Sequence, residues 1–164
     1  MAEGTTFTDT YNKALEVLAR GPKSTKDLSR WLLQRDHSPD DIAAAIAKLT
    51  ERGLLNDAAY AAMFARSRFT THHMSRRRIG AELAKRGVDR AIADAAINEV
   101  IVDENVDERA MVEAAAVKKF RTLEKLEPDV RRRRLYGFLA RKGFAPDLVR
   151  AAVANLTRST SETR

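Results

Sequence analysis

Basic side chains gather in clusters that recur along the chain. The three arginines Arg76, Arg77 and Arg78 precede a basic pair, Lys85 and Arg86. A second arginine run is again followed by a basic pair and a glycine, at the same spacing. Guanidinium and ammonium groups bind phosphates and carboxylates, so this pattern indicates recognition of a polyanion or of an acidic protein surface.

We predict that these clusters and two upstream arginines form a binding surface. A solvated charged face is the plainer interpretation, but repetition in register favours binding. Positive charge at the first turn of a helix also opposes the helix dipole, a cost that stability alone does not explain. The candidate residues for filament or DNA binding are Arg66, Arg68, Arg76, Arg77, Arg78, Lys85, Arg86, Arg132, Arg133, Arg134, Arg141 and Lys142.

Residues suited to catalysis or metal binding are scarce. The chain has no cysteine and three histidines. His72 and His73 are adjacent, so on a helix they would point about 100° apart and could not share a metal ion. The run from Gly21 to Thr25 resembles the end of a phosphate-binding loop, but it lacks the upstream glycine and its proline removes an amide. We expect no catalytic residue, no metal and no cofactor.

Composition favours helices and an anionic partner. The 164 residues carry a net charge of +7 and are 44% hydrophobic but only 6% aromatic. Glycine and proline are few, and no strand-like alternation occurs, so we predict an all-α protein. No signal peptide and no run of about 20 apolar residues is present, so we expect a cytoplasmic protein without a membrane span.

Helix-start and helix-stop signals divide the chain into three units of three helices. We predict repeats over 8–55, 56–102 and 103–157, stacked as an elongated, curved array. Thr8 or Asp9 is the expected first cap. The arginine runs are expected to open the middle helices, with Arg76–Arg78 in one and Arg131–Arg134 in another. Phe69, Phe120, Tyr136 and Phe144 could stack on bases, but their positions favour the core, which argues against stacking on a single strand as the main mode of binding. Trp31 is also expected in the core.

Two long segments resemble a known family. The string GLLNDAAYAAMFARSRF (Gly53 to Phe69), followed by SRRRIGAELAKRGV (Ser75 to Val88), closely resembles the signature of RecX, the bacterial regulator of the RecA recombinase. RGPKSTKDLSRWLLQR (Arg20 to Arg35) is similar to that family's first repeat. The resemblance spans about Tyr11 to Leu156. Asn56 stands where the family commonly has aspartate, and Thr71–Met74 replaces a glycine-containing turn.

The resemblance implies an all-α protein of tandem three-helix repeats that is not an enzyme. It implies binding to the RecA filament on single-stranded DNA, with restraint of filament growth, ATP hydrolysis and strand exchange, and a weak direct contact with DNA. We expect a monomer. The alternatives are a stand-alone basic DNA-binding regulator and a helical adaptor for another acidic partner.

Overall fold

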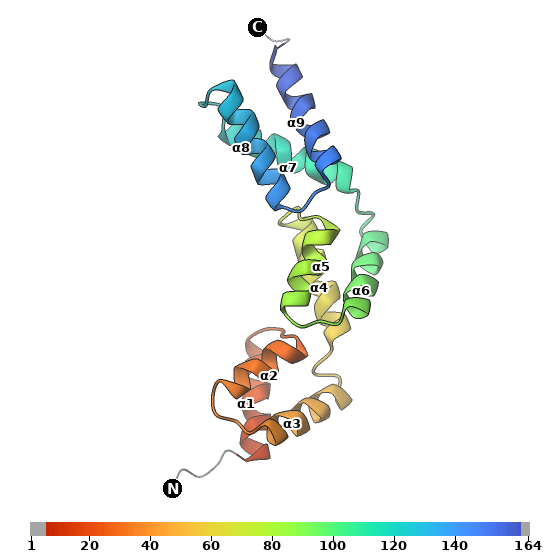
Figure 1. Cartoon of the computed structure of the whole chain (residues 1–164). Helices are drawn as coiled ribbons and strands as arrows, with labels where there is room; N and C mark the ends of the chain where they lie inside the picture. Colours follow the sequence, from red (N-terminus) through yellow and green to blue (C-terminus); the bar gives the residue numbers. More distant parts are fainter. Residues whose placement is uncertain (1–5, 162–164) are drawn as a thin grey trace. The chain divides into compact units, whose positions relative to one another are not determined.

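The chain folds into helices joined by short turns (Figure 1). A computed structural model of the protein describes residues 6–161. Within that range it contains nine helices and no strand, which confirms the predicted all-α fold. None of these helices combines the length and the apolar character that crossing a membrane requires.

The helices follow one another in groups of three, which we call the first, second and third repeat. The first repeat contains α1 (Phe7–Arg20), α2 (Thr25–Leu33) and α3 (Pro39–Glu51). The second contains α4 (Asp57–Thr70), α5 (Arg76–Lys85) and α6 (Arg90–Asp103). The third contains α7 (Glu108–Thr122), α8 (Pro128–Arg141) and α9 (Pro146–Ser161).

Contacts divide the chain into two compact units. One unit joins the chain up to Phe64 with Glu82–Ala96, and the other joins Ala65–Ala81 with the chain from Ile97 onward. Helices α4, α5 and α6 therefore contribute residues to both units. The repeat boundaries at 8–55, 56–102 and 103–157 stay a prediction.

Side-chain caps explain where several helices begin. The Ser24 hydroxyl accepts a hydrogen bond from the Asp27 amide (3.1 Å), and Ser38 caps α3 in the same way. The predicted first cap was wrong, because Thr6 caps α1. Asp9 occupies the third helical position and accepts a hydrogen bond from the Thr6 amide, which completes a capping box. A capping box satisfies two backbone donors at once, so it fixes the start of α1 at Phe7.

The middle helix of each repeat is followed by a residue in the left-handed region of the backbone. Gly87 has φ 72° and Gly143 has φ 87°. Asp36 takes this conformation in the first repeat with φ 61°. Among residues other than glycine, aspartate is one of those found most often with a positive φ. The middle helix of the first repeat can therefore be followed by the same left-handed conformation without a glycine.

Leucine, isoleucine and valine side chains form the cores. In the first repeat Leu28 and Leu32 of α2 pack with Ile42 and Leu49 of α3. In the third repeat the core residues include Leu135 and Leu139 of α8, Val149 and Val153 of α9, and Val112 of α7. Ile79, Leu83, Ile97 and Val100 of the second repeat are likewise buried. These positions recur every three or four residues, which is the spacing of one helix face.

Four of the five aromatic residues predicted in the core are buried or pack against a core. Phe69 and Phe144 are buried, and Trp31 and Phe120 pack at the edges of the first and third cores. Tyr136 differs, because 38% of its surface is exposed. It follows Leu135 on α8 and therefore points about 100° away from the buried face, so its assignment to the core was wrong.

Candidate binding surface

The arginine cluster of the second repeat lies at the very start of α5. Ser75, which is buried, caps this helix by accepting a hydrogen bond from the Arg78 amide (3.1 Å). Arg76, Arg77 and Arg78 are all exposed. The first turn contains no acidic residue, so these charges face the positive end of the helix dipole, as predicted.

The members of this cluster differ in what they contact. The Arg76 guanidinium donates a hydrogen bond to Asn98 Oδ1 (2.8 Å), and the Arg76 amide donates one to Glu108 Oε1 (2.6 Å). Over residues 6–158, no carboxylate forms an ion pair with Arg77. Arg77 is therefore the member whose charge is most available to a partner.

The arginine cluster of the third repeat lies farther along its helix than predicted. Helix α8 begins at Pro128, so Arg132, Arg133 and Arg134 fall in its second turn. The first turn holds Asp129 instead, which forms an exposed ion pair with Arg132 (3.8 Å). The dipole acts mainly within the first turn, so the argument from its cost applies to α5 and not to α8.

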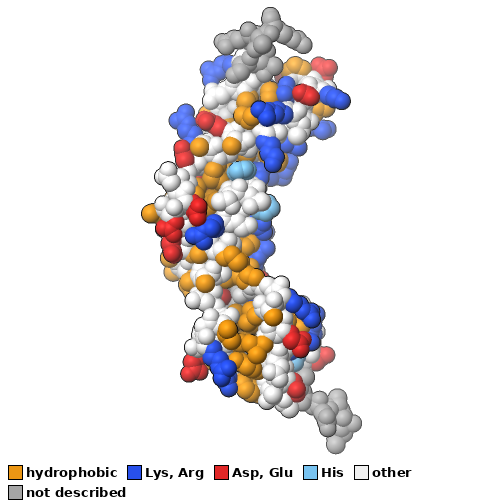
Figure 2. All heavy atoms as spheres, turned by 180° about the vertical axis from the view of Figure 1, so that it is seen from behind, with side chains coloured by type: hydrophobic (Ala, Val, Ile, Leu, Met, Phe, Trp, Pro, Cys, Tyr) orange, Lys and Arg blue, Asp and Glu red, His pale blue; other side chains and the backbone are white. Residues whose placement is uncertain are grey.

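All three arginines of this second cluster are exposed, and Figure 2 shows basic side chains interspersed with acidic ones over the third repeat. Arg133 and Arg134 have no ion-pair partner in the part of the chain that the structure describes. The preceding residue, Arg131, was grouped with them but behaves differently. Its guanidinium lies 3.2 Å from the centre of the Phe120 ring and donates a hydrogen bond to the Phe120 carbonyl (2.9 Å).

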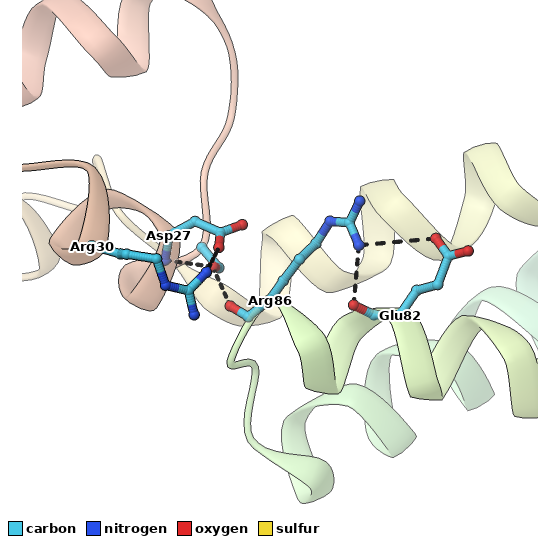
Figure 3. A network of polar contacts seen from close by, with 5 residues as sticks. Asp27, Arg30, Glu82 and Arg86 are labelled. Carbon is cyan, nitrogen blue, oxygen red and sulfur yellow. Dashed lines mark hydrogen bonds and ion pairs between the residues drawn. The ribbon is translucent and has the colours of Figure 1, made fainter. Parts of the chain in front are cut away.

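The basic pairs before the glycines take part in contacts between repeats. The Arg86 carbonyl accepts a hydrogen bond from the Ser24 hydroxyl (2.6 Å), which links the end of α5 to the start of α2 (Figure 3). The Lys142 carbonyl likewise accepts one from the Ser75 amide (3.2 Å), which links the end of α8 to the start of α5. In both cases the carbonyl of the residue before the glycine therefore joins a middle helix to the middle helix of the preceding repeat.

The side chains of Arg86 and Lys142 are half-buried. The Arg86 guanidinium lies 4.6 Å from the centre of the Phe64 ring and donates a hydrogen bond to the Glu82 carbonyl (3.1 Å). The Lys142 ammonium donates a hydrogen bond to the His72 carbonyl. Burial and the nearby Lys118 charge lower the pKa of Lys142. Both side chains therefore interact within the protein, whereas Lys85 and Arg141 beside them are exposed.

The two upstream arginines are also engaged. Arg66 Nε donates a hydrogen bond to Glu104 Oε1 (2.7 Å), and Arg66 lies 3.9 Å from Asp103. Arg68 is half-buried. The structure thus separates the candidates into a group held by internal contacts and an exposed group. The exposed residues with neither an ion pair nor a side-chain hydrogen bond in the described range are Arg77, Lys85, Arg133, Arg134 and Arg141.

One residue beside the third-repeat cluster, Arg150 of α9, escaped the sequence analysis, and another, Tyr136 of α8, was assigned to the core. Both line one hollow together with Arg132 and Arg133. Tyr136 lies four residues after Arg132, and this spacing places the two side chains on the same face of a helix. The sequence could therefore have indicated that Tyr136 lies beside the arginine cluster. Arg150 belongs to another helix, so only the packing of α9 against α8 brings it to this hollow.

Comparison with known protein families gives matches over most of the chain. The models described as the first, second and third three-helix domains of RecX match residues 11–49, 56–97 and 107–153, respectively. The chain belongs to the RecX family. This confirms the resemblance found in the sequence.

Individual RecX proteins are similar over nearly the same span. The Regulatory protein RecX of Halorhodospira halophila is 38% identical over 142 residues, covering 86% of this chain and 84% of that protein. The Regulatory protein RecX of Amycolatopsis mediterranei is 33% identical over 142 residues, covering 84% and 79%. The crystal structure of RecX from Lactobacillus salivarius has 25% identity and a TM-score of 0.72, covering 92% of this chain and 96% of that one.

The two positions expected to depart from the RecX pattern are accommodated locally. Asn56, where aspartate was expected in the family, accepts a hydrogen bond at Oδ1 from the Ala59 amide (3.0 Å) and so caps α4. In the loop that lacks glycine, His73 takes a left-handed conformation with φ 48°. Partial burial, followed by the charges of Lys142 and Lys118, lowers the pKa of His73, so the neutral imidazole is favoured there.

Proposed function

We propose that this chain binds the filament that the RecA recombinase forms on single-stranded DNA, and that binding restrains filament growth, ATP hydrolysis and strand exchange. The observation that carries the proposal is the ordered match of all three RecX three-helix domains between residues 11 and 153. The protein would act in the cytoplasm by binding alone, without catalysing a reaction.

The exposed basic residues support this proposal. Arg77, Arg133 and Arg134 are exposed and have no ion-pair partner in the described range, so binding an acidic or phosphate-bearing surface breaks no internal salt bridge at these positions. The net charge of +7 would also speed association with an anionic filament.

The test is a titration of the protein into RecA that is hydrolysing ATP on single-stranded DNA. We expect hydrolysis to fall at less than one protein per RecA subunit, and electron micrographs to show shorter filaments. Hydrolysis that stays constant across the titration would contradict the proposal.

The residues are tested with a triple variant, Arg77→Gln, Arg133→Gln and Arg134→Gln. A second variant, Lys23→Gln, Arg121→Gln and Lys125→Gln, removes the same charge at other exposed positions. We expect the first to inhibit at least tenfold less effectively and the second to inhibit nearly as well as the parent. Equal inhibition by all three proteins would show that these arginines do not form the binding surface.

A further inference from the structure

A hollow lies between α8 and α9 of the third repeat. Its volume is about 480 Å³, and its lining residues are Arg132, Arg133, Tyr136, Arg150, Val153, Ala154 and Thr157. This volume falls within the roughly 300–1,000 Å³ that is typical of sites for small molecules. The lining contains no acidic residue within the described part of the chain.

The aromatic ring in this hollow is not part of the core. Leu135 and Leu139 of the same helix are fully buried, whereas 38% of Tyr136 is exposed. Over residues 6–158 the Tyr136 hydroxyl forms no hydrogen bond with another residue. A half-exposed aromatic ring beside apolar Val153 and Ala154 offers a surface on which a flat ring system can stack.

Three arginines line the hollow together with that ring. Arg132 and Arg150 pair with Asp129 and Asp147, each three residues away on its own helix, and both carboxylates are almost fully exposed. Such exposed pairs contribute at most about 1 kcal/mol, so a phosphate can replace the carboxylates. Arg133 has no ion-pair partner in the described range. The hollow therefore combines positive charge with a stacking surface.

We propose that this hollow binds one nucleotide of single-stranded DNA. The base stacks on Tyr136, and the neighbouring phosphates contact Arg132, Arg133 and Arg150. In a duplex the bases are already stacked on one another, so only an unpaired strand can place a base on the ring. The inference goes beyond the proposed function, because it assigns base stacking to Tyr136 and a phosphate contact to Arg150, both in the hollow of the third repeat.

The test measures binding of a fluorescently labelled thymidine oligonucleotide to the full chain without RecA. Failure here would leave the RecA titration unaffected, so the two proposals are separable. Tyr136→Leu removes the ring but keeps an apolar side chain, and we expect the affinity to fall about 5- to 100-fold. Tyr136→Phe should bind like the parent, and so should Tyr60→Leu, the matched loss of a tyrosine elsewhere. Parental affinity of Tyr136→Leu, or equal affinity for duplex, would overturn the proposal.

The arginines are tested by salt dependence. Each phosphate contact on a single strand contributes about 0.7 to the slope of log affinity against log salt concentration. Arg133→Gln should lower this slope by roughly that amount, whereas Tyr136→Leu should leave it unchanged. If polyglutamate displaces the oligonucleotide equally well from the parent and from Tyr136→Leu, the hollow recognises charge alone, and the nucleotide assignment is wrong.

A direct signal for stacking is available because the chain has a single tryptophan, Trp31. Tyr136→Trp in a Trp31→Phe background leaves one tryptophan, located in the hollow. We expect its fluorescence to be quenched when the oligonucleotide binds, since stacking with a base quenches indole emission. Binding without quenching would overturn the stacking role, and this readout does not depend on the folding of Tyr136→Leu.

Discussion

Glycine is required at positions 87 and 143 by backbone conformation and by space. Both residues have positive φ. A Cβ atom added at Gly87 would lie 2.0 Å from Lys26 Cδ and 2.5 Å from Lys26 Cβ. One added at Gly143 would lie 2.6 Å from Ser75 Oγ and 2.7 Å from Arg78 Cβ. Each glycine therefore lets side chains of the preceding repeat pack directly against its backbone.

Alanine substitution separates these two requirements. We expect Gly87→Ala and Gly143→Ala to lower the free energy of unfolding by about 2–4 kcal/mol, because strain and crowding add. Gly53→Ala is the matched control, since Gly53 has φ 69° but nothing within 4 Å of an added Cβ. It should lose only about 1–2 kcal/mol. Denaturant unfolding of the three variants measures the difference, and equal losses would mean that crowding is unimportant.

Individual side-chain roles were only partly predictable from the sequence. Gly87 and Gly143 were identifiable as helix stops, because that signal is local. The half-burial of Arg86 and Lys142 was not, because their contacts with Phe64, Glu82 and the His72 carbonyl arise from folding. Tyr136 was misassigned for a similar reason. The sequence does not show how far α9 covers the side of α8.

The arginine clusters lie in different turns of helices α5 and α8. Arg77 lies in the first turn of α5, where a positive charge is unfavourable, whereas Arg134 lies in the second turn of α8. The sequence placed both clusters at helix starts, because the basic runs align by spacing. The signal for the earlier start of α8 was Pro128 followed by Asp129, because proline is favoured at the first helical position and acidic residues in the first turn.

A pair of neutralising substitutions tests this difference. Arg77→Gln should raise the free energy of unfolding by about 0.3–1 kcal/mol, because it removes an unfavourable charge at the helix start. Arg134→Gln removes the same charge where the dipole has little effect, so its stability should match that of the parent. Chemical denaturation at low salt gives the comparison. A gain in both variants, or in neither, would show that the dipole does not decide the stability here.

At the scale of the whole molecule, all-α repeats were predictable because capping residues, glycine stops and the spacing of leucines are local signals. How the repeats join was not, because the bonds connect distant residues. The Ser24 hydroxyl, which is fully buried, donates to the Arg86 carbonyl while it also caps α2. Further, the Thr25 amide donates a hydrogen bond to Asp57 Oδ1 (2.7 Å).

Ser24→Ala tests how much this joint contributes. We expect a loss of about 2–3 kcal/mol, because the helix cap is removed and the Arg86 carbonyl loses a buried donor. Ser38→Ala is the control, since the Ser38 hydroxyl caps α3 with the same geometry and, within the described residues, bonds only to Asp41. It should lose about 1 kcal/mol. If the two variants unfold at the same denaturant concentration, the bond to Arg86 adds nothing beyond capping.

Both joints use a backbone carbonyl, at position 86 or 142, and the small residue that follows it. At the second joint the Lys142 side chain adds a hydrogen bond to the His72 carbonyl. A repeat grafted from a relative should therefore dock here if it carries glycine after its middle helix. The exposed arginines could then diverge to suit a new target while the scaffold stays intact, which makes the molecule a set of interchangeable modules.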